Sequence, residues 1–434
     1  MHILGITETC DLGSMYLRLA GDGHDVRVSV SEPLAAGTMA GLVARTADWR
    51  GELDWVREAG GDGLILFEAV GFGATQDELR QQGFNVIGGS ALGDRLENDR
   101  AYALQLLGGH GLRVAPVAEF TRVEDALADL AANPRRCVFK YSASAGSTYV
   151  GAFADGRDVA AVIQAQPDAG QPFILMDAVD GVETGIGAYF DGDKFLTPAC
   201  LDWEHKRFFA GDMGELTGEM GTVATFEGSD ALFAATLAPL EPLLRGAGHV
   251  GWVNLNTIIN AEGVWPLELT CRFGYPGFAA LEPLQSLGWG ELFGAMIRRD
   301  ASSFAVRPGF CVCVVLTTPP FPYSRHEVDA AIGLPLLIGK VPPEHLHFGE
   351  VGSDGSQMVT SGLYGWTAVV TGTGSTVAEA KAAAYGHASQ VRAPNLRYRL
   401  DIGDKLISGD LRKLAAWGWL KSMPPSRMAS QIVR

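Results

Sequence analysis

Short apolar stretches alternate with amphipathic stretches through the first 95 residues of the chain. The apolar stretches have the length and composition of strands, and the segments between them carry apolar residues at helical spacing. Strands that alternate with helices form a parallel sheet with helices on its faces. We therefore expect a Rossmann-like α/β domain over residues 1–95, with strands at His2–Ile6, Asp25–Val30, Gly63–Phe67 and Asn85–Ile87 and helices near 13–20, 48–59 and 75–82.

The pattern changes after residue 95, where a helical stretch over 94–108 leads into a series of short strands around one glycine- and serine-rich loop. A hairpin over 250–270 and a helix near 290–299 follow. From about residue 309 the chain is mostly strands, with one helix that starts at a capping-box pattern, Thr376-Val-Ala-Glu379. The strands expected in these regions are Arg113–Pro116, Cys137–Lys140, Phe173–Met176, Gly185–Phe190, Phe195–Pro198, Phe310–Leu316 and Thr367–Thr373.

These changes divide the chain into several domains, because 434 residues exceed one compact core. The overall fold class is α/β with α+β parts. The C-terminal stretch, with Trp417 and Trp419, is compatible with a docked tail or with partial disorder. We predict domains over 1–95, 96–305 (with a subdomain over about 113–185) and 306–410, and a tail over 411–434.

Charge and composition limit the partners of this chain. Asp and Glu number 50 against 34 Lys and Arg, a net charge of −16 that disfavours a nucleic-acid partner. A nucleotide is still compatible, since Mg2+ and a few placed cations can neutralise its phosphates. The six cysteines are scattered, which predicts reduced thiols rather than a zinc site. The sequence shows neither a signal-peptide pattern nor an apolar run of membrane length, so we expect a soluble, cytoplasmic monomer or homodimer without a membrane partner.

A candidate phosphate site follows the strand at 137–140. Lys140 ends an apolar strand there, and a loop of small residues that includes Ser147 leads to Thr148 and the next strand. Small residues let backbone N–H groups approach phosphate oxygens, and the lysine supplies a point charge. An ordinary turn between strands has the same composition, and the loop is neither a Walker A nor a G-x-G-x-x-G sequence. Taken alone, this feature does not separate the two interpretations.

A candidate metal site lies on the hairpin. Side chains alternate between the faces of a strand, so Asn254 and Asn256 share one face, as do Glu268 and Thr270. If Ala261-Glu-Gly263 forms a three-residue turn, Asn256 lies opposite Glu268, and Asn254 lies opposite Thr270. One carboxylate and several neutral oxygens suit Mg2+, to which phosphates add ligands. A solvent-facing polar strand has the same pattern, but the apolar neighbours favour metal or nucleotide contact.

A third polar stretch, Trp203-Glu-His-Lys-Arg207, precedes the glycine-punctuated run Asp212–Gly221. A basic triplet beside such a loop could bind anions, although a solvated turn is the common alternative. Together the three elements indicate an Mg–nucleotide site between sheets. They do not identify the reaction.

The order and the sequences of these segments resemble the phosphoribosylamine–glycine ligase (glycinamide ribonucleotide synthetase) family of the ATP-grasp superfamily, from about residue 85 to 405. The resemblance implies an ATP-grasp fold with a pre-ATP-grasp N-terminal domain and a strand-rich C-terminal domain. The family's Gly-Pro-Ser is similar to Gly88–Ser90, its Asp-His-Lys-Arg to Glu204–Arg207, its Asp-x-Gly-x-Asn-Thr-Gly-Gly-Met-Gly to Asp212–Gly221 and its Glu-x-Asn-x-Arg-Phe-Gly-Asp-Pro-Glu to Glu268–Gly277, and Val359–Gly362 and Tyr398–Gly403 match its closing domain.

The resemblance also implies roles for individual residues. It implies ATP as co-substrate, with Mg2+ or Mn2+ as the metal, and it makes His205 a satisfied polar residue rather than a base. Arg272 would stabilise the transferring phosphoryl group or the carboxylate, with a structural ion pair as its alternative role. The implied sites are Arg100, Lys140, Ser147, Thr148, Met176, Asp177 and Glu183 for ATP, Glu268, Thr270 and Asn256 for the metal, and Arg272, Lys206 and Arg207 for catalysis.

Departures from the family pattern concentrate on the acceptor side. Thr270 stands where the family has a metal-binding Asn, and Arg100 where it has a Lys. Tyr275-Pro-Gly277 replaces the acidic Asp-Pro-Glu, and Phe67–Gly71 replaces a Pro-Glu-x-Pro-Leu loop. Thr7–Asp11 replaces the Gly-Gly-Arg-Glu-His that helps hold phosphoribosylamine. That last change introduces two carboxylates, Glu8 and Asp11, which would repel a phosphate.

The resemblance implies an ATP-dependent ligase that joins a small, amino-acid-like carboxylate to an amine through an acyl phosphate, with release of ADP and phosphate. The departures predict an altered acceptor, an amine that lacks a phosphate. Two alternatives stay open. One is a bona fide phosphoribosylamine–glycine ligase of purine biosynthesis that binds its acceptor with different residues, and the other is an inactive nucleotide-binding homologue.

Overall fold

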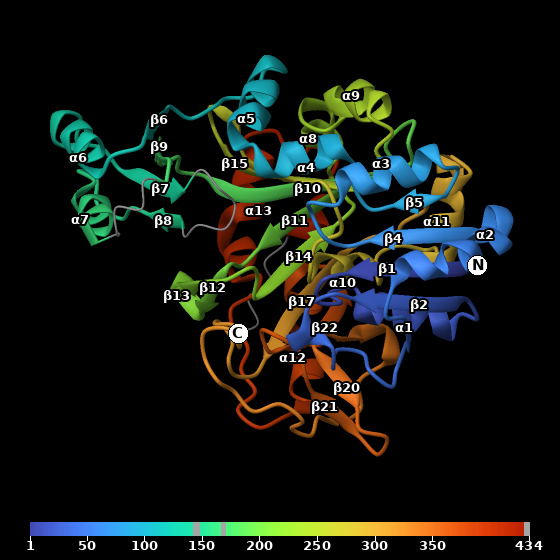
Figure 1. The fold of residues 1–434 in the computed structure, drawn as a ribbon. Coiled ribbons are helices and arrows are strands. Elements are labelled where there is room, and N and C mark those ends of the chain that lie inside the picture. Colours follow the sequence, from blue (N-terminus) through green and yellow to red (C-terminus); the bar gives the residue numbers. More distant parts are fainter. Residues whose placement is uncertain (142–147, 166–170, 429–434) are drawn as a thin grey trace.

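The structure is a computed structural model that describes residues 1–141, 148–165 and 171–428. Its N-terminal part is a five-stranded parallel sheet in the order β3-β2-β1-β4-β5 (Figure 1). The strands and helices predicted over 1–95 are confirmed, with the short β3 in addition. The elements are β1 His2–Thr7, β2 Asp25–Val30, β3 Ala44–Arg45, β4 Gly63–Phe67, β5 Val86–Ile87, α1 Gly13–Gly21, α2 Leu53–Glu58 and α3 Gly73–Gln81.

Two helices, α4 Ala91–Asn98 and α5 Arg100–Gly109, occupy the region where the pattern predicts one. Asp99 separates them, because its backbone is non-helical and its carboxylate accepts a hydrogen bond from the Tyr102 N–H at 3.0 Å. Asp99 is therefore the N-cap of α5. The break places Arg100 in the first turn of α5.

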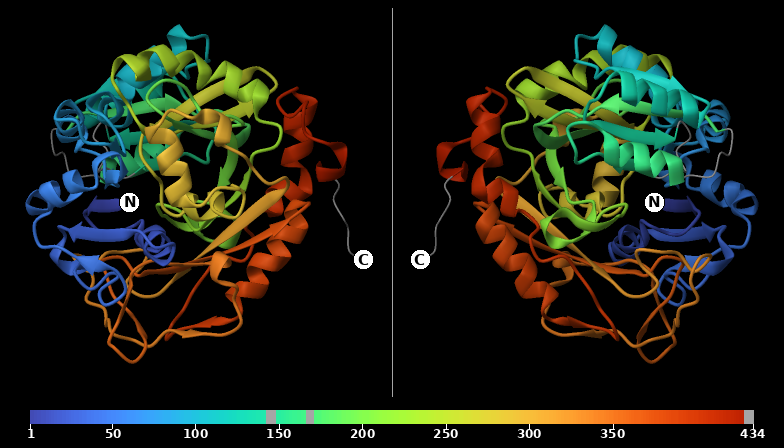
Figure 2. Two further views of the ribbon diagram at one scale, coloured as in Figure 1. Left: turned by 90° about the vertical axis from the view of Figure 1, so that its right-hand side faces the viewer. Right: turned by 90° about the vertical axis from the view of Figure 1, so that its left-hand side faces the viewer.

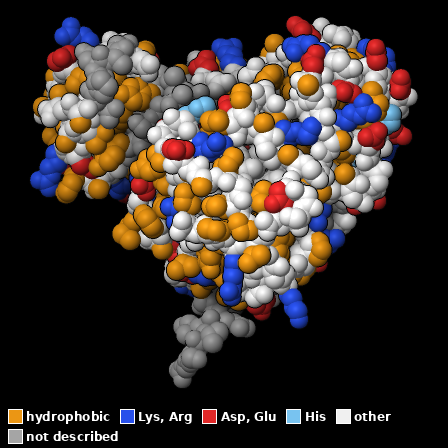
Figure 3. Space-filling model, turned by 60° about the horizontal axis from the view of Figure 1, so that its bottom comes forward, with side chains coloured by type: hydrophobic (Ala, Val, Ile, Leu, Met, Phe, Trp, Pro, Cys, Tyr) orange, Lys and Arg blue, Asp and Glu red, His pale blue; other side chains and the backbone are white. Residues whose placement is uncertain are grey.

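A four-stranded sheet in the order β6-β9-β7-β8 forms a lobe that projects from the rest of the molecule (Figures 1 and 3). The predicted strand at Arg113–Pro116 is wrong. The Arg113 N–H instead donates to the carbonyl of Val264 in the hairpin at 3.1 Å. This segment therefore lies against the hairpin, and the first strand of the lobe begins after it. The elements of the lobe are β6 Val117–Phe120, α6 Val123–Ala132, β7 Cys137–Tyr141, β8 Thr148–Val150, α7 Arg157–Ala165 and β9 Phe173–Asp177.

An eight-stranded antiparallel sheet occupies the centre, in the order β16-β15-β10-β11-β14-β17-β22-β19. Because β14 pairs with β17, this sheet continues across the predicted boundary at residue 306, and we keep the division into domains as a proposal. Its strands are β10 Val182–Phe190, β11 Cys200–Glu204, β14 Gly221–Thr225, β15 Gly251–Asn260, β16 Gly263–Thr270, β17 Phe310–Thr317, β19 Leu346–Phe348 and β22 Trp366–Gly374.

The central sheet lies between the N-terminal sheet on one side and the C-terminal helices α12 Val377–Ala388 and α13 Leu411–Ala416 on the other (Figure 2). Alternate residues of its strands, such as Leu201 and Val253, are buried on the side of α12 and α13. Leu414 and Leu420 join that core, so the described part of the predicted tail is docked. None of the described helices has the length and apolar character needed to cross a membrane.

The remaining elements cover the central sheet or extend from it. Helices α10 and α11 pack on the side of the N-terminal sheet, and a two-stranded ribbon, β12 with β13, follows β11. They are β12 Arg207–Phe209, β13 Met213–Leu216, α8 Asp230–Ala235, α9 Glu241–Gly246, α10 Gly277–Leu281, α11 Trp289–Ile297, β18 Leu337–Ile338, β20 Val351–Ser353, β21 Met358–Thr360 and β23 Val391–Arg392.

The predicted strand at Phe195–Pro198 is wrong as well. Phe195 makes a single bridge to Phe190, which closes a turn that the Asp191 carboxylate stabilises by accepting two backbone N–H groups. Pro198 has no N–H to donate, and regular pairing starts only at Cys200. The strand that follows, β11, was not predicted, because only its last two residues belong to the polar stretch Trp203–Arg207 that drew attention.

The pairing predicted for the hairpin is confirmed, although the turn is not the predicted one. Asn260 pairs with Gly263, which leaves a two-residue turn. A β-bulge between Asn256 and Thr257 then shifts the pairing of the two strands by one residue. As a result Asn256 lies opposite Glu268 and Asn254 lies opposite Thr270. The bulge compensates for the shorter turn.

Candidate active site

Polar side chains gather on one face of the central sheet, across neighbouring strands. The register aligns them in rows: Gly185 of β10 lies opposite both Asn256 and Asp202, and Glu204 lies opposite Thr222. Because side chains alternate along each strand, the residues between them point into the apolar core on the other face. The polar face carries Glu183, Asp202, Glu204, Thr222, Asn254, Asn256, Glu268 and Thr270.

Two glycines of β10 make room on this face. A Cβ at Gly185 would lie 2.1 Å from the Asp202 Oδ1, and a Cβ at Gly187 would lie 2.2 Å from the Trp252 ring. Both distances are far below van der Waals contact. Asp202 and Trp252 therefore lie over bare backbone, and the face is hollowed between them.

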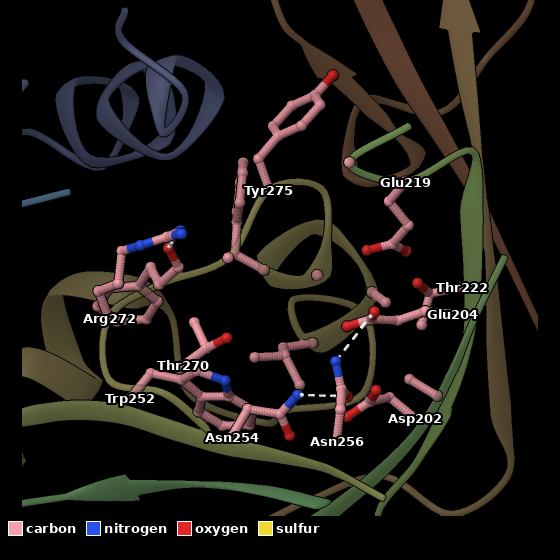
Figure 4. A pocket seen from close by; sticks show the side chains of 18 of the residues that line it. Asp202, Glu204, Glu219, Thr222, Trp252, Asn254, Asn256, Thr270, Arg272 and Tyr275 are labelled. Atoms are coloured by element: carbon pink, nitrogen blue, oxygen red, sulfur yellow. Dashed lines mark hydrogen bonds between the residues drawn. The ribbon is translucent and has the colours of Figure 1, made fainter. Parts of the chain in front are cut away.

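The resulting cavity, which we call the sheet cavity, has a volume of about 270 Å³. Figure 4 shows Asp202, Glu204 and Glu219 along one wall and Arg272 and Tyr275 on the opposite side. Asn254, Asn256 and Thr270 lie along its base (Figure 4). Five carboxylates and two basic side chains line it: Asp11, Asp202, Glu204, Glu219, Glu268, Lys206 and Arg272.

A second cavity of about 560 Å³, which we call the lobe cavity, lies between the lobe and the hairpin. The aliphatic side chains of Val138, Met176 and Leu267 form apolar walls, and Lys140 and Glu183 contribute charge. Thr148 and Arg207 line it as well. The two cavities share three residues, Glu204, Lys206 and Glu268, so they meet at this point.

Lys206 is the centre of charge where the cavities meet. Its Nζ lies 2.9 Å from Glu268, 3.1 Å from Glu204 and 4.0 Å from Glu183. Burial alone would lower the pKa of Lys206, but the three carboxylates raise it well above its usual value. The Lys206 ammonium in turn holds the pKa of the Glu268 carboxyl at about 2. Both groups are charged at neutral pH.

Two further cations face Glu268 from other elements. Arg100 in α5 donates to Glu268 at 3.1 Å through one Nη, and its other Nη is buried without a partner. Lys140 lies near the end of β7 on the lobe side, where burial and the nearby Arg100 guanidinium lower its pKa to about 8. The free donor of Arg100 and the crowded cations indicate space for an anion with several oxygens.

Comparisons with known proteins fit this geometry. Residues 98–277 match the family described as phosphoribosylglycinamide synthetase, ATP-grasp (A) domain. Over 373 residues the chain is 28% identical to a phosphoribosylamine–glycine ligase from Mycobacterium bovis, an alignment that covers 82% of this chain and 86% of that protein. Residues 98–277 thus match the ATP-grasp domain of the phosphoribosylglycinamide synthetase family, and most of the chain is similar to phosphoribosylamine–glycine ligases.

Solved structures show the same ATP-grasp fold. A crystal structure of phosphoribosylamine–glycine ligase from Thermotoga maritima has a TM-score of 0.65 at 20% identity and covers 93% of this chain and 100% of that one. The biotin carboxylase domain of 2-oxoglutarate carboxylase from Hydrogenobacter thermophilus, a complex with Mg-ADP, has a TM-score of 0.60 at 11% identity and covers 91% of each chain. The fold and the class of enzyme expected from the resemblance, an ATP-grasp ligase that forms C–N bonds, are confirmed.

The structure brings most of the residues that the family resemblance implies to the two cavities. Asp177 is an exception, since its carboxylate pairs with Arg135 at 2.8 Å and does not line the lobe cavity. Ser147 lies outside the described residues. The implied residues that line one cavity or both are Lys140, Thr148, Met176, Glu183, Lys206, Arg207, Asn256, Glu268, Thr270 and Arg272, and Arg100 reaches them through Glu268.

Three implied residues also have structural contacts that the family motif does not show. Arg272 forms an ion pair with Glu97 at 3.0 Å while it lines the sheet cavity, so its predicted alternative role is present. Arg207 donates to the Gly214 carbonyl at 2.9 Å. His205 is buried and its Nε2 accepts the Gly403 N–H at 3.2 Å, which agrees with a satisfied polar residue.

Asp202 and Glu219 are the residues of the sheet cavity that sequence reasoning missed. Asp202 and Glu204 are two residues apart, a spacing that places both on one face of a strand, but the candidate stretch began only at Trp203 and was considered as an anion site or a solvated turn. Glu219 stands at the second glycine of the family's Gly-Gly-Met-Gly run, so that the family pattern itself offered the signal.

A buried arginine fixes the ribbon beside the lobe cavity. The side chain of Arg399 is fully buried and bonds Asp212 at 2.7 Å, Asp401 at 2.5 Å and the Arg207 carbonyl at 3.0 Å. Removing one member of a buried ion pair leaves uncompensated charge, so we expect Arg399→Met to lower the free energy of unfolding by about 3–5 kcal/mol. Chemical denaturation measures this, with the exposed Arg412→Met as a control. A loss no larger than that of the control would contradict the role of Arg399.

Proposed function

We propose that this chain joins a carboxylate to an amine, driven by ATP, through an acyl-phosphate intermediate. The observation that carries the proposal is the meeting of the two cavities at Glu204, Lys206 and Glu268. ATP in the lobe cavity would direct its terminal phosphate to this point, and a carboxylate in the sheet cavity would face it. Placing both reactants at one point supplies much of the catalysis in such a reaction.

Residues of the chain have separable roles in this reaction. A carboxylate oxygen attacks the terminal phosphorus and ADP leaves; the amine nitrogen then attacks the acyl carbon, loses a proton, and phosphate leaves. Lys140, Arg100 and Lys206 would hold the phosphates and stabilise the charge that develops on them. Arg272, on the sheet-cavity side, would hold the reacting carboxylate.

The residues present also fit a divalent cation. Glu268, Asn256 and Thr270, with Glu204 beside them, offer only oxygen donors, which is the donor set that Mg2+ prefers. The Oδ1 of Asn254, buried in the same region, has no hydrogen-bond partner. The described residues contain no group of three His, Cys, Asp or Glu side chains that could hold a metal ion by themselves. The phosphates of ATP would therefore supply the remaining ligands of the ion. When bound, the ion would neutralise the phosphate charge.

Two candidates exist for the substrate pair. The curated relatives are named phosphoribosylamine–glycine ligase, and they favour that reaction over an altered acceptor. The turn between β1 and α1 favours another amine. There the Leu12 N–H donates to the Glu68 carboxylate at 3.1 Å, and the Thr7 hydroxyl donates to the same oxygen at 2.8 Å. The protein's own carboxylate therefore takes donors that could hold a phosphate at this helix N-terminus.

We expect repeated ATP turnover to require both a carboxylate and an amine. The carboxylate takes the phosphate from ATP, and the amine must then react with the acyl phosphate before the next turnover can begin. An ADP-release assay with glycine and other amino acids, each with phosphoribosylamine and with other amines, tests this. Efficient formation of glycinamide ribonucleotide would assign the family's own reaction. ADP release with other amines alone would assign an altered acceptor. Binding of ATP without ADP release from any pair would assign an inactive homologue.

A further inference from the structure

We propose that the sheet cavity binds the acceptor through a positively charged group, so that the acceptor is an unphosphorylated organic cation with a second, reacting nitrogen. Diamines and amino-guanidines are the substrate class. The proposal rests on the proposed ligase function. It is carried by two buried carboxylates that the ATP site does not use, Asp202 and Glu219.

Each of the two carboxylates has one buried oxygen without a hydrogen-bond partner. Asp202 is 9% exposed and Glu219 is 6% exposed, and the Oδ1 of Asp202 and the Oε1 of Glu219 have no hydrogen-bond partner. Figure 4 shows both on the wall that Glu204 shares. Buried carboxylates without partners are unfavourable, and a bound cation relieves that cost.

The basic groups of the cavity are already paired. Lys206 contacts Glu204 and Glu268, and Arg272 contacts Glu97 at 3.0 Å. These are the two basic side chains among the described residues that line the sheet cavity. With Arg272 holding the reacting carboxylate, a phosphate entering the cavity would meet five acidic side chains, and the remaining basic side chain of that lining, Lys206, is already paired. Like charges so close in a partly desolvated site oppose binding.

Aromatic rings complete a site for a cation. Trp252, Tyr275 and Trp366 line the cavity, and Tyr275 stacks on Trp366 with ring centroids 4.9 Å apart. The faces of such rings attract ammonium and guanidinium groups. Two of these features are departures of this chain, since Glu219 replaces a family glycine and Tyr275 replaces a family aspartate.

The position of the reacting nitrogen requires a second nitrogen in the acceptor. The attacking amine must be uncharged and must reach the acyl phosphate where the cavities meet, at Glu204, Lys206 and Glu268. A group held by Asp202 and Glu219 is charged and is therefore a different one. A volume of about 270 Å³ suits a molecule of a few carbons.

The test compares putrescine with n-butylamine, which lacks the second charge. Binding of each amine is measured by calorimetry, and ADP release is measured with glycine, ATP and Mg2+. We expect the wild type to prefer putrescine by about 30-fold or more, and we expect Glu219→Gln and Asp202→Asn each to remove most of that preference. Glu78→Gln removes the same charge from an exposed position on α3 and is the matched control.

The outcomes separate this inference from the ligase function. Equal rates of ADP release with the two amines in the wild type, or a preference unchanged in both folded variants, would overturn the inference. So would efficient use of phosphoribosylamine by the wild type. ATP binding is measured on the same samples. A putrescine preference that the variants abolish, without ADP release from any pair, would support the cation site and count against the ligase function alone. Thermal melting verifies that each variant is folded.

Discussion

Replacing Glu268 by glutamine is expected to lower turnover by a factor of about 100 to 1,000, the effect of losing one well-placed charge at a reacting phosphate. Glu268 is the residue on which Lys206 and Arg100 converge, at 2.9 and 3.1 Å. Its carboxyl has a pKa of about 2 and is ionised at any working pH. Glutamine keeps the shape and one oxygen but removes the charge that would hold the metal and orient both cations.

The variant should bind ATP without Mg2+ at least as tightly as the wild type, because its cations lose their competing partner. Addition of Mg2+ should no longer increase its affinity for ATP. Steady-state ADP release and calorimetry with and without Mg2+ measure the two effects. Glu262→Gln, in the exposed turn of the same hairpin, is the control. Near-normal turnover in Glu268→Gln would place the metal elsewhere.

The second large effect is expected at Lys140, where Lys140→Ala should weaken ATP binding by about 100-fold, because truncating a charged partner in a partly buried site has that cost. The lobe cavity places Lys140 near Glu268, Lys206 and Glu183, close to the end of β7. Lys194→Ala, at an exposed loop position, removes a lysine without touching either cavity and serves as control. Calorimetry that gave equal affinities for Lys140→Ala and the wild type would reject the assignment.

The pKa of Lys140 adds a dependence on pH. In the free protein burial and Arg100 lower that pKa to about 8, so the ammonium is charged below this value and neutral above it. Bound phosphate favours the charged form. The affinity for ATP should therefore be constant below about pH 8 and fall by up to about tenfold per pH unit above it. This decline should be absent in Lys140→Ala.

Local patterns in the sequence predicted much of the fold and the facing pairs of the candidate metal site. Alternation along the hairpin gave the facing pairs of Asn256 with Glu268 and Asn254 with Thr270, and the register confirms them. Strand–helix alternation gave the N-terminal parallel sheet. Such patterns depend on neighbours within a few residues, which a sequence displays directly.

The acceptor side was harder because it depends on residues brought together from separate strands. Asp202 on β11 and Glu219 before β14 meet only when these strands pair, and β11 was not predicted as a strand. The break at Asp99 that directs Arg100 toward the hairpin was missed too, since the apolar spacing continues through it. Tertiary packing determined these features, and local pattern did not reveal them.

The two glycines of β10 have a consequence for how the substrate range of this protein can change over time. The width of the sheet cavity between Asp202 and Trp252 depends on Gly185 and Gly187, which have no side chains to fill it. A mutation to alanine at either position would displace a wall of the cavity, whereas no mutation there can enlarge it. Drift at these two codons is thus one-directional: it can narrow the set of accepted amines, and a broader set must come from the walls themselves.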